Sequence, residues 1–429
     1  MRVLVVGNGA REDALSWRLA QSPSCEAIFA APGNAGTASR GANWEISATD
    51  GKGLADRALR EGIHLVVLGP ETAIAAGVGD RLREAGIAVF GPNRSAGRLE
   101  SSKIFAKRFM ERHGIPTAKA VVVHSLDAAR NALAQWRGGV VVKADGLAAG
   151  KGVVVTPSAD AARIVVTEWY ESSRIPGGGL DVLLEKPIAG REVSLFAICD
   201  GRAIVPFAAA CDYKRAGDGD TGPNTGGMGA YSPPDGFPDD LDATVRERIL
   251  APLLRGLLAE GEEYVGVLYC GLMWNADGPH VIEFNARFGD PETQVLVPRV
   301  GGDFAMLLQS AAQGAMDLSL ATVSRERCVG VVLATSDYPR SSTPLRGLNS
   351  DVSLPEGCQA FWGASTLVDG TISSGGGRVL TVTALGESLD EARLRAYESV
   401  KGLAGRLGSA ALTYRTDIAG PATWQAERG

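Results

Sequence analysis

Two oxygen-bearing side chains on one expected strand are candidates for metal chemistry. Glu283 and Asn285 stand two residues apart in the segment 281–292, so on a strand they share one face, while Phe284 turns toward the core. Carboxylate and amide oxygens suit a Mg²⁺ ion that also binds phosphate oxygens. Arg287 follows and has the charge to stabilise a transferring phosphoryl group. The segment therefore predicts metal-assisted phosphoryl chemistry, and a purely structural charged strand is the alternative.

A glycine-rich loop between two expected strands could fold its backbone N–H groups around a triphosphate. It carries Gly146, Gly150 and Gly152, with Lys143 before them and Lys151 between the last two. The loop is not a Walker loop, because its glycines are too close together and neither Ser nor Thr follows Lys151. The next apolar run reads as a strand. We therefore expect a phosphate-covering hairpin, with a structural hairpin as the alternative.

The turn after the first strand carries only part of a dinucleotide-binding pattern. Gly7 and Gly9 are present, but Glu12 stands where the third glycine belongs, and no acidic residue ends the second strand. These departures disfavour a nicotinamide cofactor and hence a dinucleotide oxidoreductase. An anion site at the following helix N-terminus remains an interpretation, beside that of a tight strand–helix turn.

Two further segments carry weaker signals. Glu185 and Glu192 flank a strand end whose backbone could pair with adenine, and their carboxylates could hold its amino group and the ribose hydroxyls. Asp212 and Lys214 precede a Gly- and Asn-rich stretch, residues 222–229, of the kind that binds a small zwitterion or anion. A solvated loop is the alternative for this stretch.

The elements that must position these residues fall into three expected units. Residues 1–100 alternate apolar runs and helical patterns, which is typical of a parallel, doubly wound α/β sheet with its site at the carboxyl ends of the strands. Residues 101–325 form a larger α+β unit that contains a small unit over 118–190, and residues 326–429 form a C-terminal unit. The expected helices of the small unit lie near 127–136 and 159–171.

Composition excludes several classes of protein. The chain has 429 residues, of which 45% are hydrophobic and 21% charged, so it can build a large core. Its net charge of −6 and the absence of a long basic run argue against nucleic acid as a partner. No apolar stretch reaches roughly 18 residues, so no membrane span is expected. The first apolar run lacks a cleavage site, and the six cysteines include no C-x-x-C pair, which favours the cytoplasm.

The four histidines stand apart from any Ser, Cys or metal-type arrangement. Nucleophilic triads and His-ligated zinc are therefore disfavoured.

Taken together, these segments resemble the ATP-grasp superfamily and, within it, the phosphoribosylamine–glycine ligases. The resemblance covers nearly the whole chain, and its most specific blocks are residues 218–231 and 282–294. It implies an ATP-grasp fold: a Rossmann-like N-terminal domain, an ATP-grasp core with a small ATP-covering subdomain, and a small β-rich C-terminal domain. It also implies that ATP drives the joining of glycine to 5-phosphoribosylamine through an acyl phosphate, with Mg²⁺ or Mn²⁺ as the metal.

The resemblance assigns a role to each candidate residue. Glu283 and Asn285 hold the metal. The residues implied at the reacting groups are Arg287, Asp212, Lys214 and Asp290. The residues implied in ATP binding are Lys103, Lys143, Gly150, Lys151, Gly152, Glu185, Lys186, Ile188 and Glu192. The residues implied in binding the other substrates are Gly9, Arg11, Asn34, Glu71, Asn224 and Gly226.

The chain also departs from the family pattern at five positions: Asp13, Ala73, Tyr213, Gly217 and Gly363. The family usually has His at the first, third and fifth of them. Two other readings therefore stay open: a paralogue that joins a different carboxylate and amine, and an inactive ATP-binding module. We expect small-molecule substrates, no nucleic acid or membrane partner, and a monomer or weak homodimer.

Overall fold

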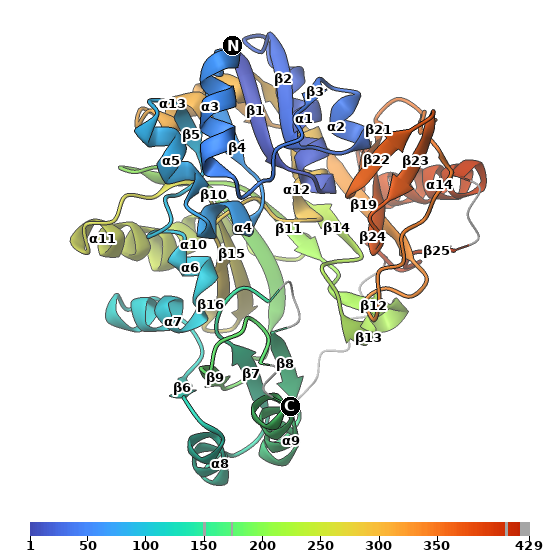
Figure 1. Cartoon of the computed structure of the whole chain (residues 1–429). Coiled ribbons are helices and arrows are strands. Elements are labelled where there is room, and N and C mark those ends of the chain that lie inside the picture. The colour runs from blue at the N-terminus through green and yellow to red at the C-terminus, as the bar shows by residue number, and fades with distance from the viewer. Residues whose placement is uncertain (149–151, 173–174, 408–410, 421–429) are drawn as a thin grey trace.

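The chain folds around a central antiparallel sheet, with a parallel sheet on one side and β-rich C-terminal structure on another (Figure 1). A small lobe projects from the central sheet at the bottom of the view. The computed structural model describes residues 1–148, 152–172, 175–407 and 411–420.

The N-terminal sheet is parallel throughout, with the strand order β3-β2-β1-β4-β5. Leu4 and Val6 of β1 belong to one hydrophobic core, and Val3 and Val5 belong to another, because both faces of the sheet are covered. The expected doubly wound sheet is therefore confirmed. Its strands are β1 (Arg2–Gly7), β2 (Ala27–Pro32), β3 (Ala42–Asn43), β4 (Leu65–Leu68) and β5 (Ala88–Phe90). Its helices are α1 (Ala10–Ala20), α2 (Ala35–Ala38), α3 (Gly51–Glu61), α4 (Glu71–Ala75), α5 (Val78–Glu84) and α6 (Arg98–Ser101).

The central sheet has the strand order β16-β15-β10-β11-β14-β19-β24-β21, and β25 pairs with β19. Its C-terminal strands are β19 (Arg327–Thr335), β21 (Cys358–Trp362), β24 (Arg378–Gly386) and β25 (Leu412–Thr413). Its first strands are β10 (Arg191–Asp200), β11 (Ile204–Asp212), β14 (Gly229–Ser232), β15 (Val265–Asn275) and β16 (Gly278–Asn285). The pairing of β14 with β19 crosses the junction at residue 325 between two expected units, so one sheet runs through both. The accompanying elements are α7 (Lys103–Arg112), α10 (Leu241–Val245), α11 (Ala251–Ala259), α12 (Glu292–Leu296), α13 (Phe304–Ala312), β12 (Arg215–Gly217), β13 (Thr221–Asn224), β17 (Val300–Gly302) and β18 (Ala321–Val323).

The small lobe packs a sheet against two helices and has its own core. The strand order is β6-β9-β7-β8. Ser125 and Ser158 accept hydrogen bonds from backbone N–H groups in the first turns of the helices and so fix where these begin. The elements are β6 (Ala120–Val123), β7 (Val140–Ala144), β8 (Val153–Thr156), β9 (Val182–Glu185), α8 (Leu126–Ala134) and α9 (Ala159–Glu171). The prediction that the first helix runs to residue 136 was wrong: Trp136 instead donates its indole N–H to the Gly139 carbonyl at 3.0 Å.

The C-terminal part is β-rich, as the resemblance implied, and one long helix covers its sheet. Its core joins strand residues such as Val331 and Val382 to Ala396 and Val400 of the helix. The elements are β19 (Arg327–Thr335), β20 (Leu348–Asn349), β21 (Cys358–Trp362), β22 (Ser365–Val368), β23 (Thr371–Ser374), β24 (Arg378–Gly386), α14 (Leu389–Leu407) and β25 (Leu412–Thr413).

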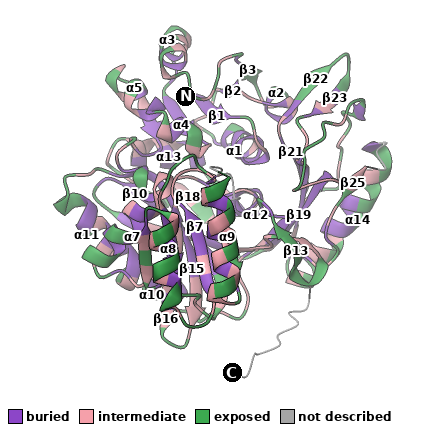
Figure 2. Ribbon diagram, turned by 60° about the horizontal axis from the view of Figure 1, so that its bottom comes forward, coloured by how far each residue is buried: buried purple, intermediate pink, exposed green. Residues whose placement is uncertain are grey.

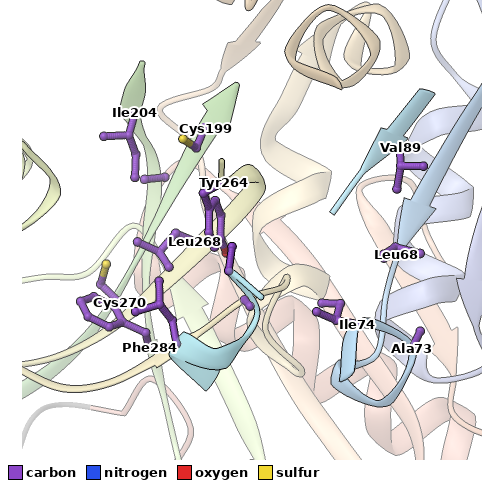
Figure 3. Packing of buried hydrophobic residues seen from close by; sticks show 14 of the residues in the cluster. Leu68, Ala73, Ile74, Val89, Cys199, Ile204, Tyr264, Leu268, Cys270 and Phe284 are labelled. Carbon is purple, nitrogen blue, oxygen red and sulfur yellow. The ribbon is translucent and has the colours of Figure 1, made fainter. Parts of the chain in front are cut away.

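One hydrophobic core joins the parallel sheet to the central sheet. Leu68 of β4 and Ile74 of α4 belong to the same buried cluster as Leu268 of β15 and Phe284 of β16, and Figure 3 shows these elements facing one another. The strands are mostly buried and the outer helices expose one face to solvent (Figure 2). The carboxyl ends of the parallel strands are thereby held against β16. None of the described helices is long and apolar enough to cross a membrane.

Candidate active site

A cavity of about 440 Å³ opens where the N-terminal sheet, the central sheet and the small lobe meet. Its walls come from the turn after β1, helix α7, strands β7, β9 and β16, and the segments around Thr225 and Arg378. Charged side chains dominate these walls. The cationic lining residues are Arg11, Lys103, Lys107, Lys143, Lys214, Arg287 and Arg378, and the anionic ones are Glu12, Glu71, Glu100, Glu185, Asp212, Glu283, Asp290 and Glu292.

Lysines gather around one buried carboxylate on the side next to the small lobe. The ammonium groups of Lys107 and Lys143 lie 2.9 Å and 2.7 Å from the two oxygens of Glu185. Lys107 also donates to the Ala118 carbonyl at 2.9 Å, and Lys143 donates to the Ile282 carbonyl at 2.9 Å. Burial lowers the pKa of Lys107, and the Glu185 carboxylate opposes that shift. This geometry fixes two cations where an anionic ligand can meet them.

Lys103 connects helix α7 to the glycine-rich loop. Its ammonium donates to the Gly146 carbonyl at 2.8 Å, while the neighbouring Asp145 carboxylate accepts the Ile104 N–H at 3.1 Å. Burial lowers the pKa of Lys103, although Glu283 and Asp145 favour its charged form. Gly152 lines the same cavity. Gly150 and Lys151, which we also expect at ATP, lie outside the described residues.

The candidate metal ligands come from β16. The Asn285 amide lies 3.4 Å from the Glu283 carboxylate, as expected for residues two apart on one strand. Burial favours a higher pKa for Glu283, but Lys214, Lys143 and Lys103 outweigh it and lower that pKa. Glu283 is therefore a half-buried, ionised carboxylate whose oxygens could bind a metal ion. Among the residues that the structure describes, no group of three or more His, Cys, Asp or Glu could hold a metal alone. The pair thus fits an ion that takes further ligands from phosphate.

Arg287 lies between two carboxylates from the N-terminal part of the chain. Its Nε is 3.0 Å from Glu71, and its Nη2 is 2.9 Å from Glu100. Burial favours a higher pKa for Glu71, but Arg287 and Arg11 outweigh it and lower that pKa to about 2. The Arg287 guanidinium is thereby fixed at the end of β16 by two carboxylates that the sequence did not connect with it.

Asp290 is held by the C-terminal part of the chain. Its carboxylate lies 3.1 Å from Nη1 of Arg378, and the same nitrogen donates to the carbonyls of Asp290 and Gly226 at 2.7 Å each. The Tyr338 hydroxyl accepts the Gly226 N–H at 2.8 Å. Asp290 and Gly226 therefore both line the cavity, as expected. Their partners Arg378 and Tyr338 lie in a part of the sequence for which we had predicted no site residue.

Asp212 and Lys214 lie together on the cavity wall. The Lys214 ammonium is 3.5 Å from Asp212 and is also hydrogen-bonded to Glu192. Burial raises the pKa of Asp212, and Lys214 opposes this shift. The hairpin beyond them is held by the chain end instead of facing the cavity, since Asp218 accepts the Thr416 N–H and Asp220 pairs with Arg415. Within the segment of the zwitterion interpretation, the cavity lining therefore includes Asp212, Lys214, Thr225 and Gly226, and not the hairpin residues between them.

Some predicted residues lie elsewhere in the described structure. Asn34 caps α2 and donates to the Asn8, Gly9 and Trp362 carbonyls at 3.0, 3.0 and 2.8 Å. Lys186 is exposed and lies over the Trp136 ring. Of the described residues, the cavity lining includes neither of these two, nor Ile188, Glu192 or Asn224. Their roles toward substrates stay predictions. Gly9, Arg11 and Glu71 do line the cavity.

Two of the departures from the family pattern, Asp13 and Tyr213, contact the C-terminal part of the chain. Asp13 is fully buried, accepts the Trp362 N–H at 2.9 Å and lies 3.6 Å from Arg40. Burial raises its pKa to about 6. Tyr213 accepts the Ala419 N–H at 3.0 Å. The cavity lining, taken over the described residues, contains none of Asp13, Ala73, Tyr213, Gly217 and Gly363.

Sequence reasoning missed several cavity residues: Glu12, Glu100, Lys107, Glu292, Tyr338 and Arg378. Lys107 had a readable signal, because it stands four residues after Lys103 and so shares its helix face. Glu100 and Tyr338 had no such signal in the sequence. Each reaches the site through a residue far away in the chain, Glu100 through Arg287 and Tyr338 through Gly226. Glu292 lies inside the block 282–294 that carried the resemblance, yet received no role.

Comparison with known proteins assigns three consecutive parts of the chain to domains of one protein family. Residues 1–100 match the model of the N domain of phosphoribosylglycinamide synthetase, residues 101–293 that of its ATP-grasp (A) domain, and residues 328–421 that of its C domain. The chain therefore belongs to the phosphoribosylglycinamide synthetase family of ATP-grasp proteins, and the resemblance seen in the sequence is confirmed.

Individual relatives agree over nearly the full length. The chain is 43% identical to a phosphoribosylamine–glycine ligase of Ralstonia nicotianae over 404 residues, which cover 94% of this chain and 95% of the relative. It is 44% identical to one of Allochromatium vinosum, covering 93% and 94%. The crystal structure of a Thermotoga maritima phosphoribosylamine–glycine ligase superposes with a TM-score of 0.84 at 33% identity, covering 97% and 100%. The biotin carboxylase domain of Hydrogenobacter thermophilus 2-oxoglutarate carboxylase shares the fold alone, with a TM-score of 0.72 at 14% identity, over 93% and 89%.

Proposed function

We propose that this chain joins glycine to 5-phosphoribosylamine at the expense of ATP, giving glycinamide ribonucleotide, ADP and phosphate. The observation that carries the proposal is one cavity in which a lysine cluster, two oxygen ligands on β16 and a fixed arginine meet. These are the parts that phosphoryl transfer to a carboxylate needs. Family membership adds the identity of the two acceptor substrates.

The reaction has two steps. A glycine carboxylate oxygen attacks the γ-phosphorus of ATP, the bond to the β–γ bridging oxygen breaks, and ADP leaves with glycyl phosphate formed. The amine nitrogen of 5-phosphoribosylamine then attacks the acyl carbon, inorganic phosphate leaves, and the nitrogen loses a proton. No side chain forms a covalent bond, so the protein contributes positioning, charge and exclusion of water.

The lysine side suits ATP. Lys103 and Lys143 would contact its phosphates, and Glu185 fixes Lys143 while its other oxygen is held by Lys107. Glu283 and Asn285 would hold a divalent ion, Mg²⁺ with Mn²⁺ as the alternative. When bound, such an ion neutralises the phosphate oxygens and withdraws charge from the transferring group.

The remaining walls suit the other two substrates. Arg287 is held by Glu71 and Glu100 beside the metal ligands, so its charge lies where glycyl phosphate would form. Asp212 and Lys214 offer opposite charges to a zwitterion such as glycine. Arg11 and Gly9 lie on the N-terminal wall, where we assign the phosphoribosylamine.

We also propose that the three expected units act as domains and that the chain works in the cytoplasm as a monomer or weak homodimer. The separate hydrophobic core of the small lobe supports its assignment as an ATP-covering subdomain. Cytoplasmic conditions suit the six cysteines, all of which are free thiols in the structure.

The proposal is tested by detecting ADP across a matrix of carboxylates and amines. We expect glycine with 5-phosphoribosylamine to exceed every other pair, and in particular any amine that lacks the 5-phosphate. A different preferred pair would identify a paralogue with another substrate. ADP formation with no pair, from a folded protein that binds ATP, would favour an ATP-binding module.

A further inference from the structure

A buried carboxylate fills the turn at which the sequence suggested an anion site. Glu12 on α1 has only 1% of its side chain exposed. Its Oε2 accepts the Gly9 N–H at 2.6 Å, and its Oε1 accepts the Nε–H of Arg11 at 2.6 Å. The turn therefore already contains its anion, which is a side chain of the same chain.

Three glycines make the space for this carboxylate. A Cβ placed on Gly69 would lie 2.0 Å from Oε1 of Glu12, one on Gly9 would lie 2.8 Å from Oε2, and one on Gly7 would lie 2.6 Å from the carboxylate carbon. Gly7 also has a φ of 125°, which side chains rarely adopt. The incomplete dinucleotide pattern is explained by this arrangement: its glycines enclose Glu12, which takes the place of the third glycine.

Glu12 also fixes a cation on the cavity wall. The Arg11 guanidinium is bonded through Nε to Glu12, and its Nη1 donates to the Phe288 carbonyl at 3.0 Å. Phe288 follows Arg287, so Arg11 connects the N-terminal turn to the segment that carries the predicted catalytic arginine. Because two of its donors are held at opposite ends, the guanidinium has one orientation in the cavity.

We propose that Glu12 is a positioning residue for the amine substrate. It orients Arg11 toward the cavity and occupies the Gly9 N–H, so that the substrate's phosphate is recognised by Arg11 and not by the turn's backbone. This inference rests on the proposed function, since it names the residues that meet the phosphoribosylamine. Of the three substrates, only 5-phosphoribosylamine should bind less well when Glu12 is changed.

Glu12→Gln tests the assignment, because glutamine keeps the size of the side chain and removes its charge. We expect the KM for 5-phosphoribosylamine to rise about tenfold, since a charge-assisted hydrogen bond to Arg11 is lost. The KM values for ATP and glycine should stay within twofold, and kcat within about threefold. A purely structural role would alter all three KM values together.

The neighbouring residue supplies a matched control. Asp13 is also a buried carboxylate on α1, but it bonds the Trp362 N–H and does not line the cavity. Asp13→Asn should leave all three KM values within twofold of the parent. A selective rise in the KM for the amine in this variant would overturn the assignment to Glu12.

A double variant tests whether Glu12 acts through Arg11. Arg11→Ala alone should raise the KM for the amine, and adding Glu12→Gln should raise it no further. Multiplying effects would overturn the proposal. If Glu12→Gln does not fold, Arg11→Lys decides the matter: it keeps the charge but lacks the Nε–H, so we expect the same selective rise, and an unchanged KM overturns the proposal. A parent that forms no ADP with this pair would instead contradict the proposed function.

Discussion

The two sides of the cavity balance charge in different ways. On the lysine side, Lys107 and Lys143 share the single carboxylate of Glu185. On the arginine side, each guanidinium has its own carboxylate partners: Arg11 has Glu12, Arg287 has Glu71 and Glu100, and Arg378 has Asp290. Cations therefore exceed direct carboxylate partners on the first side, whereas carboxylates match or exceed them on the second.

From this difference we infer that the lysine side accepts the more highly charged ligand. Excess positive charge on the lysine ammonium groups suits the polyanionic phosphates of ATP, which complete the neutralisation when they bind. Paired guanidinium groups have fixed orientations and little net charge, which suits smaller substrates that must meet at a defined angle. Glu283 and Asn285 lie where the two sides meet.

The largest effect is expected at this meeting point. Glu283→Gln removes the charge of a proposed metal ligand, which should cost several kcal/mol of phosphoryl-transfer stabilisation and so reduce kcat by about 100-fold or more. Steady-state ADP formation measures it, with the urea midpoint as the control for folding. A kcat within threefold of the parent value would contradict the assignment of Glu283 as a metal ligand.

Arg287→Lys should have the next largest effect, because lysine cannot bridge Glu71 and Glu100 as the guanidinium does. We expect kcat/KM for glycine to fall by about 2 kcal/mol in transition-state terms, roughly 30-fold. The KM for ATP should change little. Should the loss fall on ATP instead, the division of the cavity into two sides would be wrong.

A smaller effect is expected on the lysine side. Lys107→Met leaves Glu185 with Lys143 as its remaining direct cation, so the lysine cluster loses one positive charge. The KM for ATP should rise about tenfold, or roughly 1.4 kcal/mol, while the KM for glycine stays unchanged. Lys52→Met, at an exposed lysine on α3, is the control and should behave as the parent. Equal increases in the KM values for ATP and glycine would contradict the assignment of ATP to the lysine side.

The smallest effect on activity is expected for Asp13→Asn, but this variant should change how stability depends on pH. Burial raises the pKa of Asp13 from 3.8 to about 6, so the stability that its protonated form provides is present below pH 4 and is lost as the pH rises through about 6. Relative to the variant, the parent's free energy of unfolding should fall by up to about 3 kcal/mol between pH 4 and pH 7. Urea unfolding at a series of pH values measures this, and parallel curves would contradict the buried, ionising Asp13.

Much of the fold could be predicted from the sequence where apolar runs were long and clearly bounded. Helix α9, for example, begins and ends at the residues expected, Ala159–Glu171. Strand β11, Ile204–Asp212, carries a proline and small residues, so its pattern lacked the alternation that marks a strand. Its identity depends on β10 and β14, which pair with it on either side.

Site residues that are close together in the sequence could be predicted to lie side by side. Contacts between residues far apart in the sequence could not. Glu283 and Asn285 are neighbours on one strand, so spacing alone brought them together. The Glu71–Arg287 and Asp290–Arg378 pairs join residues that are far apart in the sequence, so no local pattern predicts them. The contacts of Asn34 show the same limit, because the sequence does not indicate that its amide donates to backbone carbonyls, one of them that of the distant Trp362.

In our proposal the two sides of the cavity meet at a glycine carboxylate oxygen, which receives the γ-phosphoryl group of ATP. This step is tested by supplying glycine labelled with ¹⁸O in both carboxylate oxygens, together with ATP and 5-phosphoribosylamine, and analysing the released phosphate by mass spectrometry. We expect one labelled oxygen in each phosphate and one in the amide product, because the acyl phosphate gives up the bridging oxygen with phosphate. Phosphate without label, formed together with glycinamide ribonucleotide, would contradict it.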